Sequence, residues 1–228
     1  MEPDTDPAAA GPESPPKVRL PVTKKILTSS ACIAVLLIAG CAGKVRYPKF
    51  YTLEIPAVLK PAANSARVAG AVSVRRFETP AYLRQGRIVY REAPEAVDFY
   101  EYHRWAAEPG PTVTAGVIDS IRSAGLFSFV KSYDGQDKPE YLMTGRLERL
   151  DEIDYGDRVR VETRLSAELM DARTGTTIWT GTAAATSDVE TSNMNSVVAA
   201  MSRTLQMNID RLVTEMEKQL PRSDAASR

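Results

Sequence analysis

The most regular pattern of apolar and polar positions lies between residues 158 and 169. Odd-numbered positions there are mostly apolar, from Val159 through Leu165 to Leu169, whereas even-numbered positions are charged or carry a hydroxyl group. A period of two residues predicts a β-strand with one buried and one solvated face. Sheets with one face in water are commonly antiparallel, so this run favours an antiparallel sheet.

Shorter apolar or alternating runs predict the other strands. They lie at residues 50–55, 68–74, 88–90, 97–105, 127–130, 141–150 and 176–186. Two of these runs are close together in the chain and predict one hairpin over residues 87–105. The segment DARTG, residues 171–175, predicts the turn into the last strand.

Two segments show helical spacing instead. Val113, Val117, Ile118 and Ile121 predict a helix over residues 111–124, ended by Gly125. A second stripe predicts a closing helix over about residues 192–220; its members are Val197, Val198, Met201, Leu205, Ile209, Leu212, Val213 and Met216. Both helices can cover the dry side of the sheet. The expected fold class is therefore α+β: a largely antiparallel sheet with two amphipathic helices packed on one face.

Composition excludes several classes of function. The 228 residues include 29 basic and 29 acidic side chains, so no field of one sign draws the chain to nucleic acid, and we expect no nucleic-acid partner. One histidine and two cysteines exclude most zinc sites, Cys-His nucleophile pairs and disulfide frameworks. The chain contains no GxxxxGK[ST], GxGxxG or GxSxG motif. We expect a protein that is not an enzyme, with no catalytic residues, no metal and no cofactor.

Two local features look chemical but have simpler interpretations. His103 lies beside Arg104 and Trp105, yet no second histidine or nucleophile accompanies it, which favours a packed or surface histidine on a strand. The acidic segment LDEIDYGD, residues 150–157, lacks the oxygen spacing of a calcium loop. We interpret it as a solvated hairpin tip.

The first forty residues have the order of a secretory signal. A proline-rich segment, residues 1–16, is followed by a basic segment, residues 17–25, an apolar run, residues 31–39, and then Gly40 and Cys41. A membrane-spanning helix needs about 20 apolar residues, roughly twice the length of this run. An uncleaved membrane anchor and a buried core segment are weaker interpretations of this apolar run than a cleaved signal.

The residues Ile38-Ala39-Gly40-Cys41 resemble the bacterial lipobox. This resemblance implies that the leader is cut before Cys41 and that this cysteine carries the acyl chains, palmitate among them, that anchor the protein. Cleavage would remove Cys32 and leave no disulfide. The predicted organisation is a disordered N-terminus and signal peptide at 1–40, a lipidated tether at 41–49, an α+β domain at 50–220 and a disordered tail at 221–228. A 40-residue leader is long for this class and points to a start downstream of Met1.

Five aromatic residues gather on the predicted hairpin: Tyr90, Phe99, Tyr100, Tyr102 and Trp105. Strict alternation places Tyr100, Tyr102 and Arg104 on one face and Phe99, His103 and Trp105 on the other. Two interpretations of the tyrosine row are open. The tyrosines form cross-strand pairs, or the row with Arg104 is an interface for a partner, an apolar ligand or another copy of the chain.

Three segments together resemble a known family. FYTLEIP, TPAYLRQGRIVYR and YEYHRWAAEP are similar to the ABC-type transport auxiliary lipoprotein family, whose best-known branch is PqiC. The resemblance covers residues 51–216. Its signature positions are Ala81, Tyr82, Leu83, His103 and Trp105.

The resemblance implies a non-enzymatic lipoprotein of the outer membrane of a Gram-negative bacterium, facing the periplasm. It would be an auxiliary component of an intermembrane lipid transporter, with an MCE-domain protein and ABC permease and ATPase subunits as partners. Ala42, in place of an aspartate retention signal, is compatible with sorting to the outer membrane. The alternative is an accessory lipoprotein of outer-membrane assembly or lipopolysaccharide export.

Overall fold

Three long antiparallel strands form the body of the sheet in the computed structural model, which describes residues 46–56, 67–136, 138–191 and 193–220. They are β6 (Tyr141–Ile153), β7 (Arg160–Asp171) and β8 (Thr177–Asp188). Leu165 of β7 lies between Leu147 of β6 and Ala183 of β8, and all three side chains are buried. The predicted alternation along β7 is confirmed. The predicted signal peptide, Cys41 and the tail at 221–228 lie outside the described residues.

The other edge of β6 is shared by two pairs of strands. β2 (Val68–Val74) pairs in parallel with the start of β6, and β5 (Phe127–Ser132) pairs in parallel with β2. β3 (Arg87–Arg91) pairs in parallel with the end of β6, and β4 (Asp98–Trp105) completes the predicted hairpin. β1 (Lys49–Tyr51) adds in parallel to β4. The longest ladders are antiparallel and the sheet as a whole is mixed.

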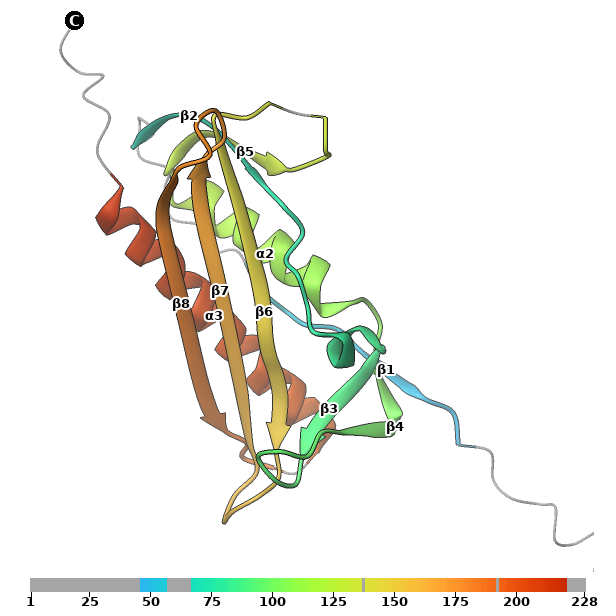
Figure 1. The fold of residues 1–228 in the computed structure, drawn as a ribbon. Coiled ribbons are helices and arrows are strands. Elements are labelled where there is room, and N and C mark those ends of the chain that lie inside the picture. The colour runs from blue at the N-terminus through green and yellow to red at the C-terminus, as the bar shows by residue number, and fades with distance from the viewer. Residues whose placement is uncertain (1–45, 57–66, 137, 192, 221–228) are drawn as a thin grey trace, which may run out of the picture. The chain divides into compact units, whose positions relative to one another are not determined.

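Two helices lie behind the sheet in Figure 1: α2 (Pro109–Ser123) and α3 (Met194–Gln219). A short 3-10 helix, η1 (Ala81–Arg84), precedes β3. The α+β class with two helices on one face is therefore confirmed. The side chain of Asn193 accepts a hydrogen bond from the backbone N–H of Ser196 and begins α3, as expected of an N-cap.

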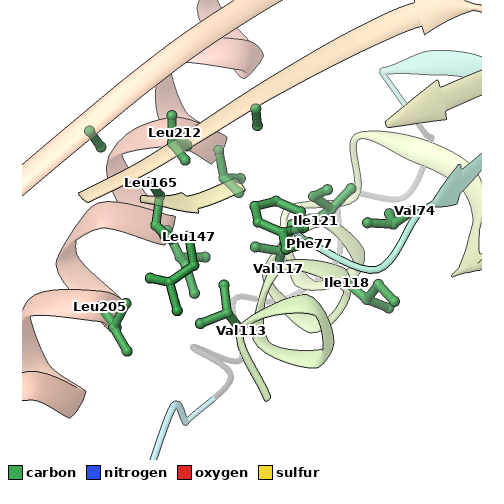
Figure 2. Packing of buried hydrophobic residues seen from close by; sticks show 14 of the residues in the cluster. Val74, Phe77, Val113, Val117, Ile118, Ile121, Leu147, Leu165, Leu205 and Leu212 are labelled. Carbon is green, nitrogen blue, oxygen red and sulfur yellow. The ribbon is translucent and has the colours of Figure 1, made fainter. Parts of the chain in front are cut away.

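The core lies between the helices and the sheet. Figure 2 shows Phe77, Val117 and Ile121 close together, with Leu147 and Leu165 beside them. These side chains belong to one buried cluster. A Cβ atom on Gly145 would lie 2.3 Å from Cζ of Phe77, so the phenyl ring packs directly on the backbone of β6. Glycine is required at that close approach.

Two predicted segments differ from the structure. Of the strand predicted at 50–55, only Phe50 and Tyr51 belong to a strand, β1, because β4 ends at Trp105 and residues 52–56 have no neighbouring strand to pair with. The interpretation of residues 150–157 as a solvated hairpin tip is wrong for its first half. β6 continues to Ile153, and Asp151 and Glu152 are buried because β3 and β7 flank this end of the strand.

No helix among the described residues is both long enough and apolar enough to cross a membrane.

Candidate functional site

The β3–β4 hairpin departs from strict alternation. Arg87 of β3 pairs with Arg104 of β4, and Val89 pairs with Phe99. Two residue steps along β3 therefore correspond to five along β4. The extra residues of β4 form a bulge, which re-aims side chains. The ring of Tyr100 therefore contacts His103 edge-on, at 5.4 Å between centroids, although alternation alone would put the two on opposite faces.

The hairpin covers two buried carboxylates at the end of β6. Asp151 has no exposed side-chain surface, and Nε of Arg91 donates to its Oδ2 at 2.6 Å. Nε of Arg149 lies 3.7 Å from the same oxygen, and Nη1 of Arg149 donates to Glu162 at 2.7 Å. Oδ1 of Asp151 has no hydrogen-bond partner among the described residues. A buried carboxylate is tolerated here because two guanidinium groups lie close to it.

Tyr82 covers the same ion pair. The guanidinium of Arg91 lies 5.9 Å from the centroid of the Tyr82 ring, and the Tyr82 hydroxyl donates to the carbonyl of Glu148 at 3.3 Å. Burial, followed by the charge of Asp151, raises the pKa of Tyr82. Tyr82 thus stays a neutral phenol that covers the ion pair.

Glu152 is the second buried carboxylate, with 4% of its surface exposed. The hydroxyl of Tyr100 donates to its Oε2 at 3.0 Å, and the ring of Tyr90 lies 4.7 Å from that of Tyr100. Burial raises the pKa of Glu152, while the Tyr100 hydrogen bond opposes that shift. The pKa of Tyr100 is raised by its own burial and then by the charge of Glu152. Tyr100 therefore stays protonated and acts as the donor.

β1 joins this hairpin through Tyr51 and His103. A hydrogen bond of 2.9 Å connects the Tyr51 hydroxyl and Nδ1 of His103, and their rings lie 5.5 Å apart. Burial and the charge of Lys49 lower the pKa of His103, so its imidazole is neutral at neutral pH. The interpretation of His103 as a packed histidine is confirmed. No group of three potential metal ligands occurs among the residues that the structure describes.

An open groove of about 760 Å³ lies beside β1. One wall is the extended segment that follows β1, in which Leu53 and Ile55 turn inward. The groove side of this wall is formed by Phe50, Tyr51, Thr52, Glu54 and Pro56. Ile55 reaches α2, where a Cβ on Gly116 would lie only 2.6 Å from Cγ2 of Ile55. Glycine at this position brings the segment close to the helix.

α3 forms the opposite wall. Its groove residues recur at spacings of three and four, next to the stripe that packs on the sheet. They are Asn195, Val198, Ala199, Ser202, Arg203, Gln206 and Met207. The backbone N–H of Glu54 donates to Oγ of Ser202 at 3.1 Å, which joins the two walls. We define the groove residues of both walls as the β1–α3 groove.

The predicted site residues have different surroundings. Tyr100, Tyr102 and Arg104 are each half-buried on β4, and Tyr100 supports the buried Glu152. Of the signature positions, Leu83 and Trp105 belong to the core, Tyr82 and His103 are half-buried in the contacts above, and Ala81 is exposed. These roles are mainly structural. The β1–α3 groove was not predicted from the sequence; the signal for it was Met207, an apolar residue of the closing helix that lies outside the buried stripe.

Comparison with known proteins gives a family and a fold. The family model described as the ABC-type transport auxiliary lipoprotein component matches residues 51–216. A crystal structure of protein XCC0632 from Xanthomonas campestris is similar at 15% sequence identity, with a TM-score of 0.63, and covers 75% of this chain and 100% of that one. A crystal structure of an uncharacterized protein is similar at 12% identity, with a TM-score of 0.57, and covers 75% of this chain and 99% of that one. No curated protein matches the chain.

Proposed function

Because the chain belongs to the ABC-type transport auxiliary lipoprotein family, we propose that it is the non-enzymatic lipoprotein component of a transporter that moves lipid between membranes. The observation that carries this proposal is the family match, which spans residues 51–216 and so nearly the whole described fold. A solved structure that covers 75% of the chain has the same fold. ATP hydrolysis would then belong to other subunits.

The membrane anchor in this proposal is Cys41. Acyl chains on this residue would attach the protein to the periplasmic face of the outer membrane of a Gram-negative bacterium. One acyl chain binds a membrane only weakly, whereas several chains make the attachment stable. Replacing Cys41 with serine should abolish labelling by radioactive palmitate and leave an uncleaved or mislocalised precursor. Label on the Cys41→Ser protein would contradict this part of the proposal.

The partners proposed are an MCE-domain protein and the ABC permease and ATPase subunits. For the contact surface we retain Tyr100, Tyr102 and Arg104 on β4. Aromatic and arginine side chains are the types enriched at binding hot spots. Tyr100 would contribute by supporting the strand, since its hydroxyl binds Glu152.

The test is cross-linking in intact cells followed by purification of the mature, acylated protein. We expect the MCE-domain and permease subunits to be recovered with it, and to be lost when Cys41→Ser is used as the matched control. Recovery of outer-membrane assembly or lipopolysaccharide-export proteins in place of transporter subunits would overturn the proposal in favour of the alternative machine.

A further inference from the structure

Large apolar side chains are exposed to solvent in the β1–α3 groove. Phe50 is 62% exposed and Met207 is 53% exposed, and both line the groove. Other apolar residues of the two walls, such as Leu53 and Leu205, are buried in the core. An exposed apolar hollow that is bordered by polar groups is a candidate binding site. Its volume of about 760 Å³ lies within the range of small-molecule sites.

Polar groups on the two walls are arranged around this apolar surface. Arg203 on α3 and Glu54 on the segment after β1 both line the groove, and neither forms an ion pair with any described residue. The groove therefore offers one cation and one anion beside its apolar surface.

From this chemistry we infer that the β1–α3 groove binds one phospholipid molecule, with an acyl chain along Phe50, Val198 and Met207. The phosphate would contact Arg203, and a headgroup ammonium would contact Glu54. A zwitterionic headgroup pairs with both charged groups, whereas a bare hydrocarbon pairs with neither of them. The small side chain of Ala199 on the α3 wall leaves room for the acyl chain.

The short tether proposed between Cys41 and β1 favours the membrane as the source of this lipid. This step rests on the proposed function, because it takes Cys41 as the membrane anchor. Nine residues lead from Cys41 to Phe50, and nine residues extend over at most about 32 Å. The groove thus begins within about 32 Å of an acylated Cys41, close enough to receive a lipid from the same membrane. A second copy of the chain or a partner helix are the competing occupants.

The experiment uses the full-length chain with Cys41→Ser and a short-chain phosphatidylethanolamine supplied in solution below its micelle concentration. Binding is followed by changes in NMR signals of the Met207 methyl group and by titration calorimetry. We expect saturable binding that shifts the Met207 signal. Ala199→Trp, which fills the groove from an exposed helix position, should weaken binding at least tenfold. Thr214→Trp, at an exposed position of α3 outside the groove, is the matched control and should leave binding unchanged.

Arg203→Glu should weaken binding of the phospholipid but not of a fatty alcohol of the same chain length. The inference is overturned if the lipid does not bind, if Ala199→Trp binds as well as Thr214→Trp, or if the Met207 signal responds to protein concentration instead of lipid. The last result would indicate that a second copy occupies the groove. Because the lipid is added from solution, the measurement is independent of Cys41 acylation, so failure of the proposed anchor does not affect it.

Discussion

Neighbouring residues of β7 differ in their surroundings. Leu165 has no exposed surface, whereas Arg164 is exposed on the opposite face of the sheet. Leu165→Asp would bury an unpaired charge and remove apolar packing, at a cost of about 4 kcal/mol or more. Arg164→Asp should change the free energy of unfolding by less than about 1 kcal/mol. Urea unfolding of the two variants measures the difference, and equal unfolding midpoints would show that the strand faces are misassigned.

The raised pKa of Glu152 predicts a specific dependence of stability on pH. Its pKa is raised in the folded protein, so between the unfolded pKa and that raised value the folded state binds more protons than the unfolded state. The contribution of Glu152 to stability therefore falls as pH rises through this window. Glu152→Gln is neutral and keeps an oxygen that accepts from Tyr100.

The Glu152→Gln variant should be more stable than the native protein at pH 7 to 8, and the difference should shrink as pH falls toward the unfolded pKa of about 4.3. Thermal unfolding across this pH range provides the measurement. Glu101→Gln, at an exposed position of β4, is the control and should show no such trend. A native protein that is the more stable of the two at pH 8 would refute the assignment of Glu152 as a destabilised carboxylate.

At the scale of elements, Asn208 joins α3 to the sheet. It is fully buried, and its Nδ2 donates to the carbonyl oxygen of Thr163 at 3.2 Å and to Oγ1 of Thr163 at 2.8 Å. Asn208→Ala removes both hydrogen bonds and leaves buried acceptors unpaired, at an expected cost of about 1 to 3 kcal/mol. Thr214→Ala, at an exposed position of the same helix, should cost less than about 0.5 kcal/mol. Denaturant midpoints that do not separate the two variants would mean that this contact does not stabilise the helix on the sheet.

β1 is the element whose predicted extent changed most. Residues 50–55 have the apolar content of a strand, yet only the part beside β4 forms a ladder, and the last bond runs from Ala106 N–H to the carbonyl of Tyr51 at 2.8 Å. A strand needs a neighbour, and the chain beyond Tyr51 passes α2 and α3 instead. Inward and outward side chains still alternate, which is why this stretch forms a groove wall.

At the scale of the whole molecule, Tyr100 and Tyr102 are expected to differ. Tyr100→Ala removes the donor to the buried Glu152 and should destabilise the fold. Tyr102→Ala should weaken co-purification of the MCE-domain protein that we propose as partner. Loss of one hot-spot anchor costs about 2 kcal/mol, which is about 30-fold in affinity. Tyr100→Phe, which keeps the ring, is the comparison for stability. Undiminished assembly of a folded Tyr102→Ala protein would remove this row from the proposed interface.

Local sequence alone predicted the elements that repeat regularly. The alternation around Leu165 and the stripe from Val197 to Met216 correctly predicted β7, α3 and the buried face of each, because both patterns arise from residues close together in the chain. The family resemblance over residues 51–216 was likewise present in the sequence and is confirmed. The interface at Tyr100, Tyr102 and Arg104 and the acylation of Cys41 stay predictions.

Tertiary structure alone decided what depends on neighbours distant in sequence. Asp151 and Glu152 have the composition of a solvated turn, but β3, more than 60 residues earlier, lies against that end of β6, and Arg91 arrives with it. The β1–α3 groove joins residues about 150 positions apart, such as Glu54 and Ser202. Periodicity reports which side of an element is apolar, but not which element covers it. The parallel strand pairs, the burial of the two carboxylates and the groove all depend on which elements pack against each other. That packing is decided only when the whole chain folds.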